Sequence, residues 1–177
     1  MGGDTAAIAN TREGVAGAYQ LVSGLFLRLL ALVYLVAFVS LGLQITGLAG
    51  ADGILPFSAQ LQHLEAEYGA ERFLVSPNLF WFSASDLALQ GVAIAGAVFS
   101  VLLFFNILQR LSLVLLFICY LSLYHAGLPF TNFQWDYLLL ESGFLAIFLP
   151  YGSGITIFLF RWLLFRLRFQ SGISKLL

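Results

Sequence analysis

Polar and ionisable side chains that could perform chemistry are concentrated in one stretch of this chain, between His125 and Tyr151. The stretch opens with a polar and aromatic patch made of Thr131, Asn132, Gln134, Trp135 and Asp136. It then becomes strongly apolar, and a carboxylate, Glu141, stands among its leucines and phenylalanines. An ionisable group in such a segment is costly in hydrocarbon, so it is normally turned inward and paired. This stretch is therefore the candidate functional region.

A partner for Glu141 is available in the apolar segment that follows, which carries Arg161 and Arg166. Glu141 lies about nine residues before Pro150, and Arg161 lies about nine residues after Gly152. At about 1.5 Å per residue, antiparallel packing across the intervening turn would bring these two charges to a similar depth. We expect Glu141 to be buried in the bundle and to pair with Arg161 first and Arg166 second. A charge-paired structural role is favoured over catalysis.

The sequence contains no recognisable catalytic constellation. Our buried polar or functional candidates are Asn132, Gln134, Trp135, Asp136, Glu141, Arg161 and Arg166. A single cysteine, Cys119, excludes an internal disulfide and a Cys-x-x-Cys redox pair. The two histidines, His63 and His125, are far apart and would make a poor metal site. We therefore predict no catalytic residue, no metal and no cofactor, and that the protein is not an enzyme.

Composition places the chain in the membrane. Of 177 residues, 60% are hydrophobic and only 10% are charged, with a mean hydropathy of +0.94. A soluble domain is normally about half apolar and about a quarter charged. The excess of apolar surface predicts an integral membrane protein with membrane lipids as partners. The net charge of -1 gives no reason to propose a nucleic acid partner.

Five apolar runs predict the helices that must position the candidate residues. They cover residues 25–48, 87–108, 111–124, 136–149 and 155–169. A helix needs about 20 apolar residues to span the bilayer core, so the fourth run is short and could be tilted or partly re-entrant. A cleaved signal peptide is the alternative interpretation of the first run. We favour a retained membrane helix, because signal-peptide cores are about 7–15 residues long and lie nearer the start. We expect an all-α polytopic transmembrane bundle of about five membrane helices.

The remaining sequence divides around these runs. Residues 1–24 read as a polar N-terminal arm, and residues 25–177 as the bundle, with an extramembrane loop at 49–84. Within the loop, Ala59 to Phe73 has helical character and is most simply a solvated surface helix. Ser83 to Asp86 resembles a capping box at a helix N-terminus.

Small residues in the second run favour close contact between helices. They form the pairs Gly91 with Ala95 and Gly96 with Ser100. Packing is a commoner role for such pairs than dimerisation.

Basic residues near the apolar runs predict the orientation in the membrane. Arg12, Arg28 and Arg110 agree with a cytoplasmic N-terminus and a cytoplasmic turn between the second and third runs. Five spans would then place the C-terminus on the opposite side of the membrane. The positive-inside rule conflicts with this placement, because the C-terminal segment carries Arg166, Arg168 and Lys175.

The same central stretch resembles the lipase maturation factor family. In chain order, the blocks that carry the resemblance are Gly53–Pro56, Phe80–Asp86, Phe133–Leu149 and Arg161–Leu176. They cover nearly the whole chain after the N-terminal arm and match in polar detail. The family is similar, more remotely, to the membrane region of vitamin K-dependent gamma-glutamyl carboxylases, but no carboxylase site carries over residue by residue.

The resemblance implies a multi-pass protein of the endoplasmic reticulum membrane in a eukaryote, or of the plasma membrane in a bacterium. Animal members help secreted lipases to fold and assemble, so the implied function is chaperone-like maturation of a secreted client such as a lipase. Family members continue into a large lumenal domain implicated in client binding, so we expect this chain to hold only the membrane half, as a fragment or a short relative.

Two other functions stay open at this point. One is a structural subunit of a larger membrane assembly. The other is a membrane enzyme of the carboxylase type, in which Asp136, Glu141 and the arginines would form a buried polar site.

Overall fold

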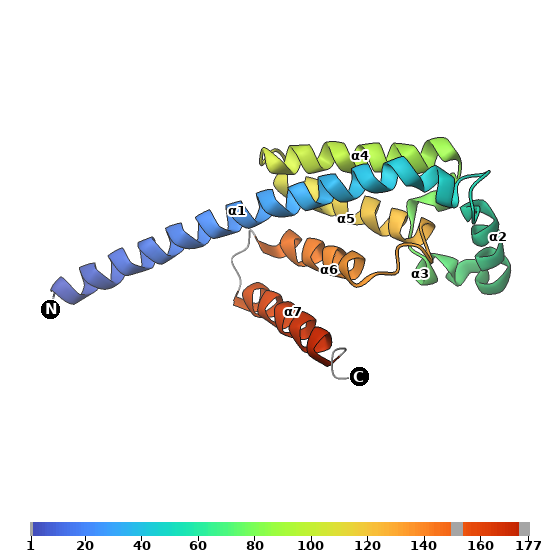
Figure 1. The fold of residues 1–177 in the computed structure, drawn as a ribbon. Coiled ribbons are helices and arrows are strands. Elements are labelled where there is room, and N and C mark those ends of the chain that lie inside the picture. Colours follow the sequence, from blue (N-terminus) through green and yellow to red (C-terminus); the bar gives the residue numbers. More distant parts are fainter. Residues whose placement is uncertain (1, 150–153, 174–177) are drawn as a thin grey trace.

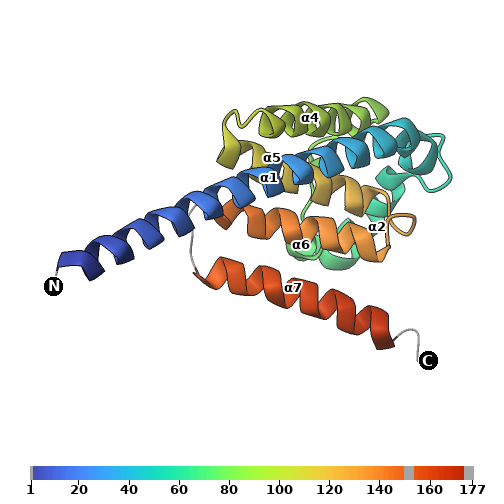
Figure 2. The same cartoon turned by 60° about the vertical axis from the view of Figure 1, so that its left-hand side comes forward.

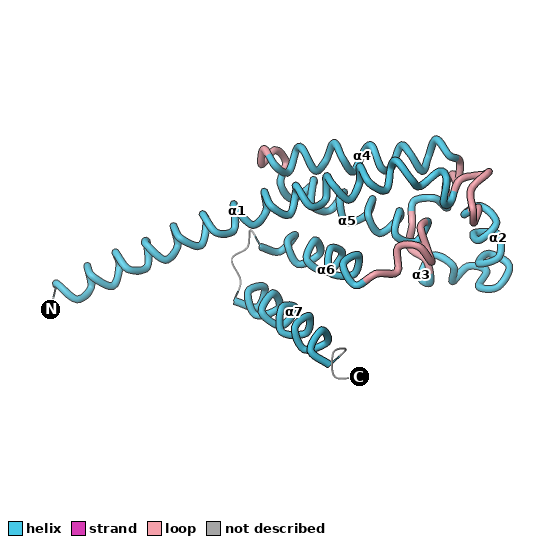
Figure 3. The backbone as a smooth tube through the Cα atoms, viewed as in Figure 1, coloured by secondary structure: helices cyan, strands magenta, loops and turns pink. Residues whose placement is uncertain are grey.

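A computed structural model describes residues 2–149 and 154–173, and all regular structure in these ranges is helical (Figures 1 and 3). The elements are α1 (Gly2–Ala49), α2 (Phe57–Tyr68), η1 (Gly69–Glu71), α3 (Arg72–Val75), η2 (Leu79–Trp81), α4 (Asp86–Phe104), α5 (Gln109–Ala126), α6 (Gln134–Phe148) and α7 (Gly154–Ile173). The expected all-α polytopic bundle is confirmed.

Three described helices are long and apolar enough to cross a membrane. Their spans are Tyr19–Ala49, Asp86–Phe104 and Gln109–Ala126. Helix α6 has 15 residues and rises about 22 Å, which is less than the bilayer core of about 30 Å. Helix α7 has 20 residues but carries three arginines, Arg161, Arg166 and Arg168. That α6 and α7 complete a set of five membrane helices stays a prediction.

The bundle is built outward from α1. Helix α1 packs along α4, α4 packs on α5, and α5 packs on α6. Helix α7 lies beside α6 at the edge of the bundle, with a looser contact (Figure 2). In the core, the rings of Tyr34 and Phe38 from α1 each lie 5.7 Å from the Tyr120 ring of α5. These buried aromatic contacts join α1 directly to α5.

A glycine allows α1 and α4 to approach closely. A Cβ atom on Gly96 would lie 2.2 Å from the ring of Phe38, so no larger side chain fits without movement. Ser100, one turn on, is buried and donates its hydroxyl to the Gly96 carbonyl at 2.8 Å. Gly91 differs, because nothing lies within 4 Å of its Cβ position. Of the two small-residue pairs, only Gly96 with Ser100 lies in the helix contact.

Residues 50–85 fold into a helical cap at one end of the bundle (Figure 1). The Phe57 and Phe80 rings are buried in it, 5.8 Å apart. The Leu79 amide donates to the Ser122 hydroxyl of α5 at 3.0 Å, which ties the cap to the bundle. Ser85 caps α4 by accepting from the Ala88 amide at 3.2 Å.

Two helix boundaries differ from expectation. The second apolar run was expected to reach Leu108, with a tight polar connection over Asn106–Arg110. Helix α4 ends at Phe104, and α5 begins at Gln109, because Asn106 and Leu108 adopt positive φ values of 60° and 48°. Left-handed residues end a helix and let the chain reverse into α5. Helix α1 is continuous from Gly2 to Ala49, so the proposed arm is not a separate backbone element. The boundary at residue 24 stays a prediction.

Candidate functional site

Asp136 lies in the first turn of α6 and points into the bundle, where its side chain is only 6% exposed. One carboxylate oxygen accepts from the Tyr120 hydroxyl of α5 at 2.7 Å. The other accepts from the Phe133 backbone amide at 3.3 Å. A carboxylate is stabilised at a helix N-terminus by the helix dipole and by unpaired amides. Asp136 therefore both caps α6 and fastens it to α5.

The loop between α5 and α6 is held by a second set of hydrogen bonds. The Asn132 side-chain oxygen accepts from the Tyr137 hydroxyl at 2.6 Å and from the Tyr124 hydroxyl at 3.4 Å. The Thr131 hydroxyl, which is buried, donates to the Tyr124 carbonyl at 2.8 Å. His125 closes the end of α5 through a 2.8 Å contact between its Nδ1 and the Leu121 carbonyl. The polar patch is thus a structural network around the α6 N-terminus.

Three of the candidate residues in this patch, Asn132, Gln134 and Trp135, are exposed and not buried. The Trp135 side chain is 65% exposed and stacks on Phe133, with 4.7 Å between ring centroids. Gln134 is also exposed and lies at the mouth of a groove beside α7. The expected burial of these three residues is wrong. Asn132 lies in the loop before α6, and Gln134 and Trp135 lie on the outer side of its first turn, whereas Asp136 faces inward. An exposed tryptophan at a helix end is typical of a residue at the membrane–water interface.

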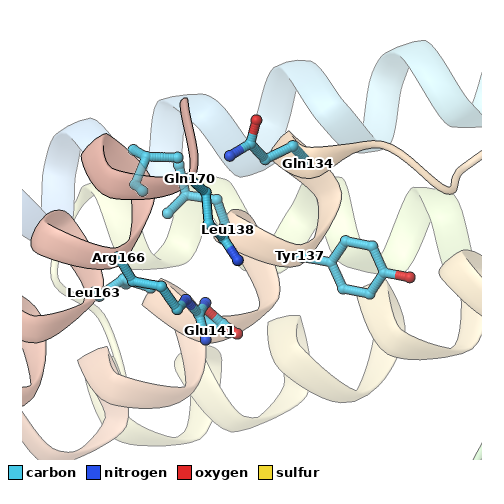
Figure 4. A pocket seen from close by; sticks show the side chains of 8 residues that line it. Gln134, Tyr137, Leu138, Glu141, Leu163, Arg166 and Gln170 are labelled. Atoms are coloured by element: carbon cyan, nitrogen blue, oxygen red, sulfur yellow. The ribbon is translucent and has the colours of Figure 1, made fainter. Parts of the chain in front are cut away.

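Glu141 forms an ion pair with Arg166 across the α6–α7 contact (Figure 4). The pair lies in a groove of about 240 Å³. The groove is lined by Gln134, Tyr137, Leu138, Glu141, Leu163, Arg166, Leu167 and Gln170. The pair is not buried, because the Glu141 side chain is 37% exposed and that of Arg166 is 42% exposed.

Pairing of Glu141 with an arginine of the last helix is confirmed, but the partner is Arg166 and not Arg161. Equal counts along the two helices match the depth of two residues but not the helix face on which they lie. The count also crosses Pro150 and Gly152, which lie outside the described residues. Five residues separate Arg161 from Arg166, which is about 140° around a helix. Arg166 shares the α6-facing side of α7 with Leu163 and Gln170, whereas Arg161 lies in a groove against α1.

The two carboxylates do not share a site. Asp136 and Glu141 are also five residues apart, so they point about 140° away from one another around α6. Asp136 faces α5, and Glu141 faces α7. Within residues 19–149 and 154–173, no three His, Cys, Asp or Glu side chains gather as a metal site would require. The arrangement fastens three helices together and presents a polar groove at their edge.

Sequence reasoning missed the tyrosines that complete these contacts. Tyr34 is 0% exposed and donates its hydroxyl to the Leu139 carbonyl of α6 at 3.1 Å. A Cβ atom on Gly143 would lie 1.8 Å from that hydroxyl, so Gly143 makes room for it. The Tyr120 hydroxyl donates to Asp136, and the Tyr124 hydroxyl donates to Asn132. The signal was a tyrosine inside an apolar run, because a hydroxyl in hydrocarbon needs an acceptor.

Comparison with known proteins gives a consistent picture. The family model described as lipase maturation factor transmembrane domain matches residues 21–177. Lipase maturation factor 2 of Xenopus tropicalis is 41% identical over 180 residues, which cover 90% of this chain and 25% of the relative. The Homo sapiens protein of that name is 35% identical, covering 86% of this chain and 25% of the relative. Lipase maturation factor 1 of Bos taurus is 32% identical, covering 91% of this chain and 32% of the relative.

The chain therefore spans only a quarter to a third of the length of these relatives. No solved structure matches it.

Proposed function

Because the chain belongs to the lipase maturation factor family, we propose that it is the membrane part of a factor that assists the folding or assembly of a secreted client of the lipase class. The observation that carries this proposal is the family match over residues 21–177, which takes in every described helix after the start of α1. Its place would be the endoplasmic reticulum membrane in a eukaryote or the plasma membrane in a bacterium. The protein itself is a multi-pass membrane protein.

The geometry supports a scaffold more than a reaction site. The cap of residues 50–85 is tied to α5 by the contact between Leu79 and Ser122, and the α5–α6 loop beside it is tied by Asn132 and Asp136. One end of the bundle thus carries an ordered extramembrane surface. We infer that a client, or the client-binding part of a longer chain, meets the protein at this end.

A thiol-exchange mechanism has no support from the described residues. Cys119 is buried in α5 and is the one cysteine of the chain. Catalysis of disulfide exchange within one chain needs a pair of thiols, with an accessible thiolate to attack. The part that this chain plays in such assistance would therefore act through contact and not through thiol exchange.

A structural subunit is the second candidate function, favoured by the apolar surface of α7. Large side chains of this helix, including Phe158, Trp162, Phe165 and Phe169, are each more than half exposed. Such a surface in a membrane contacts lipid or another apolar helix. A carboxylase-type enzyme is not favoured, because Asp136 and Glu141 face different neighbours.

Expression in cells that lack their own maturation factor tests the proposal. The full-length protein containing this chain is co-expressed with a secreted lipase, and the specific activity of the secreted lipase is measured. We expect that activity to rise severalfold, while the secretion of an unrelated soluble protein stays unchanged. An unchanged lipase activity at normal abundance of the factor would contradict the proposal. An equal effect on both secreted proteins would favour a general structural role.

A further inference from the structure

The second half of the cap, residues 72–82, exposes large apolar side chains. They are Phe73, Leu74, Val75, Leu79 and Phe82, which we call the apolar rim. Leu74 of α3 is 85% exposed, and Phe82, which follows η2, is 90% exposed. A protein surface in water rarely displays such a group of apolar side chains unless another surface covers it. The apolar rim therefore needs a neighbour.

A hydrogen bond places the apolar rim level with the end of a membrane helix. Helix α5 is long and apolar enough to cross a membrane, and it ends at Ala126. The Leu79 amide donates to the Ser122 hydroxyl of α5. Ser122 lies one helical turn, about 6 Å, before the end of α5, so η2 lies beside the last turn of that helix. Figure 1 agrees, because α3 lies nearer to the bundle than α2, which is outermost.

A cluster around Arg72 holds α3 to η2 at this depth. The Arg72 guanidinium carbon lies 4.8 Å from the centroid of the Phe73 ring and 5.1 Å from that of the Trp81 ring. The two ring centroids are 5.7 Å apart, and the Trp81 indole N–H donates to the Ser76 carbonyl at 2.8 Å. Arg72 also forms an ion pair with Glu65 of α2. One arginine thus joins a carboxylate of α2 to an aromatic surface, as is typical of side chains at a membrane–water boundary.

The Phe82 end of the apolar rim is continuous with the surface that the bundle presents to lipid. The outer side of α4 exposes Leu87, Ile94, Val98 and Val101. These four residues fall within about 60° of one another around a helix that is long and apolar enough to span the membrane. Phe82 precedes the first of them by five residues, at the level where α4 begins. The exposed Trp135 marks a similar boundary at the start of α6.

From this depth and this continuity we propose that the apolar rim binds the lipid surface, as an anchor at the boundary between headgroups and acyl chains in the leaflet at the cap end. Leu74 and Phe82 enter the acyl region, Arg72 lies at the level of the phosphates, and the carboxylates of α2 stay in water. Apolar and aromatic side chains beside basic residues bind a bilayer surface in this manner. The anchor would hold the cap at a fixed height above the membrane. It rests on the membrane location of the chain and not on a lipase client, so either proposal can fail alone.

Spin labels on the intact protein in phosphatidylcholine vesicles measure the depth of the apolar rim. Single cysteines at Leu74 and Phe82, in a Cys119→Ser background, carry the label. Electron paramagnetic resonance then compares collisions of each label with oxygen, which concentrates in lipid, and with a water-soluble nickel chelate. We expect the ratio of oxygen to nickel collisions at both positions to be severalfold higher than at Ala66, an exposed residue of α2, and to approach that at Val98 of α4. A ratio at either position equal to that at Ala66 would overturn the proposal and favour a protein partner for the rim.

A second measurement needs no label. Leu74→Asp removes little packing within the protein, because the side chain is exposed, but it places a charge in lipid and should detach the anchor. A glutamate-specific protease added on the cap side should then cleave at Glu65, Glu67 or Glu71 severalfold faster, because the cap opens more often. Leu74→Phe is the matched control, since it keeps an apolar side chain, and should leave the cleavage rate unchanged. An unchanged rate in Leu74→Asp, or an equal rise in both variants, would contradict the anchor.

Discussion

The two carboxylates of α6, Asp136 and Glu141, are stabilised within the apolar bundle in two different ways. Asp136 is neutralised by hydrogen bonds from a hydroxyl and a backbone amide. Glu141 is neutralised by the opposite charge of Arg166. The first solution needs only local geometry, whereas the second depends on α7 being docked. Substitutions at the two carboxylates should therefore report on different contacts.

The Glu141–Arg166 pair should show strong coupling. Glu141→Gln and Arg166→Gln each leave one charge without its partner beside hydrocarbon, so each should destabilise the protein by about 1–3 kcal/mol. The double substitution removes both charges and should cost less than the sum of the two single losses. Unfolding in mixed detergent micelles measures all three free energies. Arg161→Gln is the matched control on the same helix and should show no coupling to Glu141→Gln; strictly additive losses at Glu141 and Arg166 would contradict the pairing.

The hydroxyl of Tyr120 should matter more than its ring. Tyr120→Phe keeps the aromatic contacts with Tyr34 and Phe38 but removes a hydrogen bond to the buried Asp136 carboxylate. The expected loss in the free energy of unfolding is about 1–3 kcal/mol, because the carboxylate stays partly unsatisfied. Tyr68→Phe, in the exposed part of α2, should change it by no more than about 0.5 kcal/mol. In an Asp136→Ala background, which removes the acceptor, the Tyr120→Phe loss should shrink; an undiminished loss would show that Asp136 is not the reason.

At the scale of elements, the contact between α1 and α4 depends on one missing side chain. Gly96→Ala places a methyl group against the Phe38 ring, and overpacking of this kind costs about 1–3 kcal/mol. Gly91→Ala adds the same methyl group on the same helix in open space, and should be neutral or stabilising by up to about 1 kcal/mol. The comparison is made by chemical unfolding followed by circular dichroism. Phe38→Leu should recover part of the Gly96→Ala loss, whereas equal effects at the two glycines would contradict the packing.

The helices themselves could be predicted because hydrophobicity and length alone decide which segments enter lipid. The start of α4 also followed from its sequence, since the Ser85 hydroxyl accepts from the Ala88 amide there. Asp86 did not behave as part of a capping box, because its carboxylate instead accepts from the Ala51 amide at 2.8 Å across the cap. That contact joins residues 35 positions apart, which no local pattern encodes.

In the candidate site, too, the sequence indicated the residues but not their partners. Asp136 and Glu141 were identifiable as costly charges within an apolar segment. Their partners, Tyr120 and Arg166, depend on which helix faces which neighbour and on rotation about the helix axis. Counting along the chain fixes depth but not rotation, which is why Arg161 was expected before Arg166.

At the scale of the whole molecule, the arrangement of the helices bears on orientation. The cap, the α5–α6 loop and the end of α7 lie at one end of the bundle, because Gln134 and Gln170 line one groove. The α4–α5 turn and the start of α7 lie at the other end. An N-terminus in the cytoplasm would then leave Arg166 and Arg168 toward the opposite side, against the positive-inside rule. Arg161 does not add to this conflict, because it lies toward the other end of the bundle, as Arg28 does.

Single cysteines in a Cys119→Ser background test this orientation. Thr131 is a poor labelling position because its side chain is buried, whereas Ser58, Asn132 and Gln170 are exposed at the cap end. Ile107, in the α4–α5 turn, is the exposed position at the other end. With the N-terminus in the cytoplasm, a membrane-impermeant maleimide applied to intact cells should label the first three positions but not Ile107. Permeabilised cells, in which all four should react, control for accessibility of the thiols. Labelling of Gln170 from the side of Ile107 would show that α7 does not cross back beside α6, and labelling of Ser58 and Asn132 from opposite sides would contradict the bundle itself.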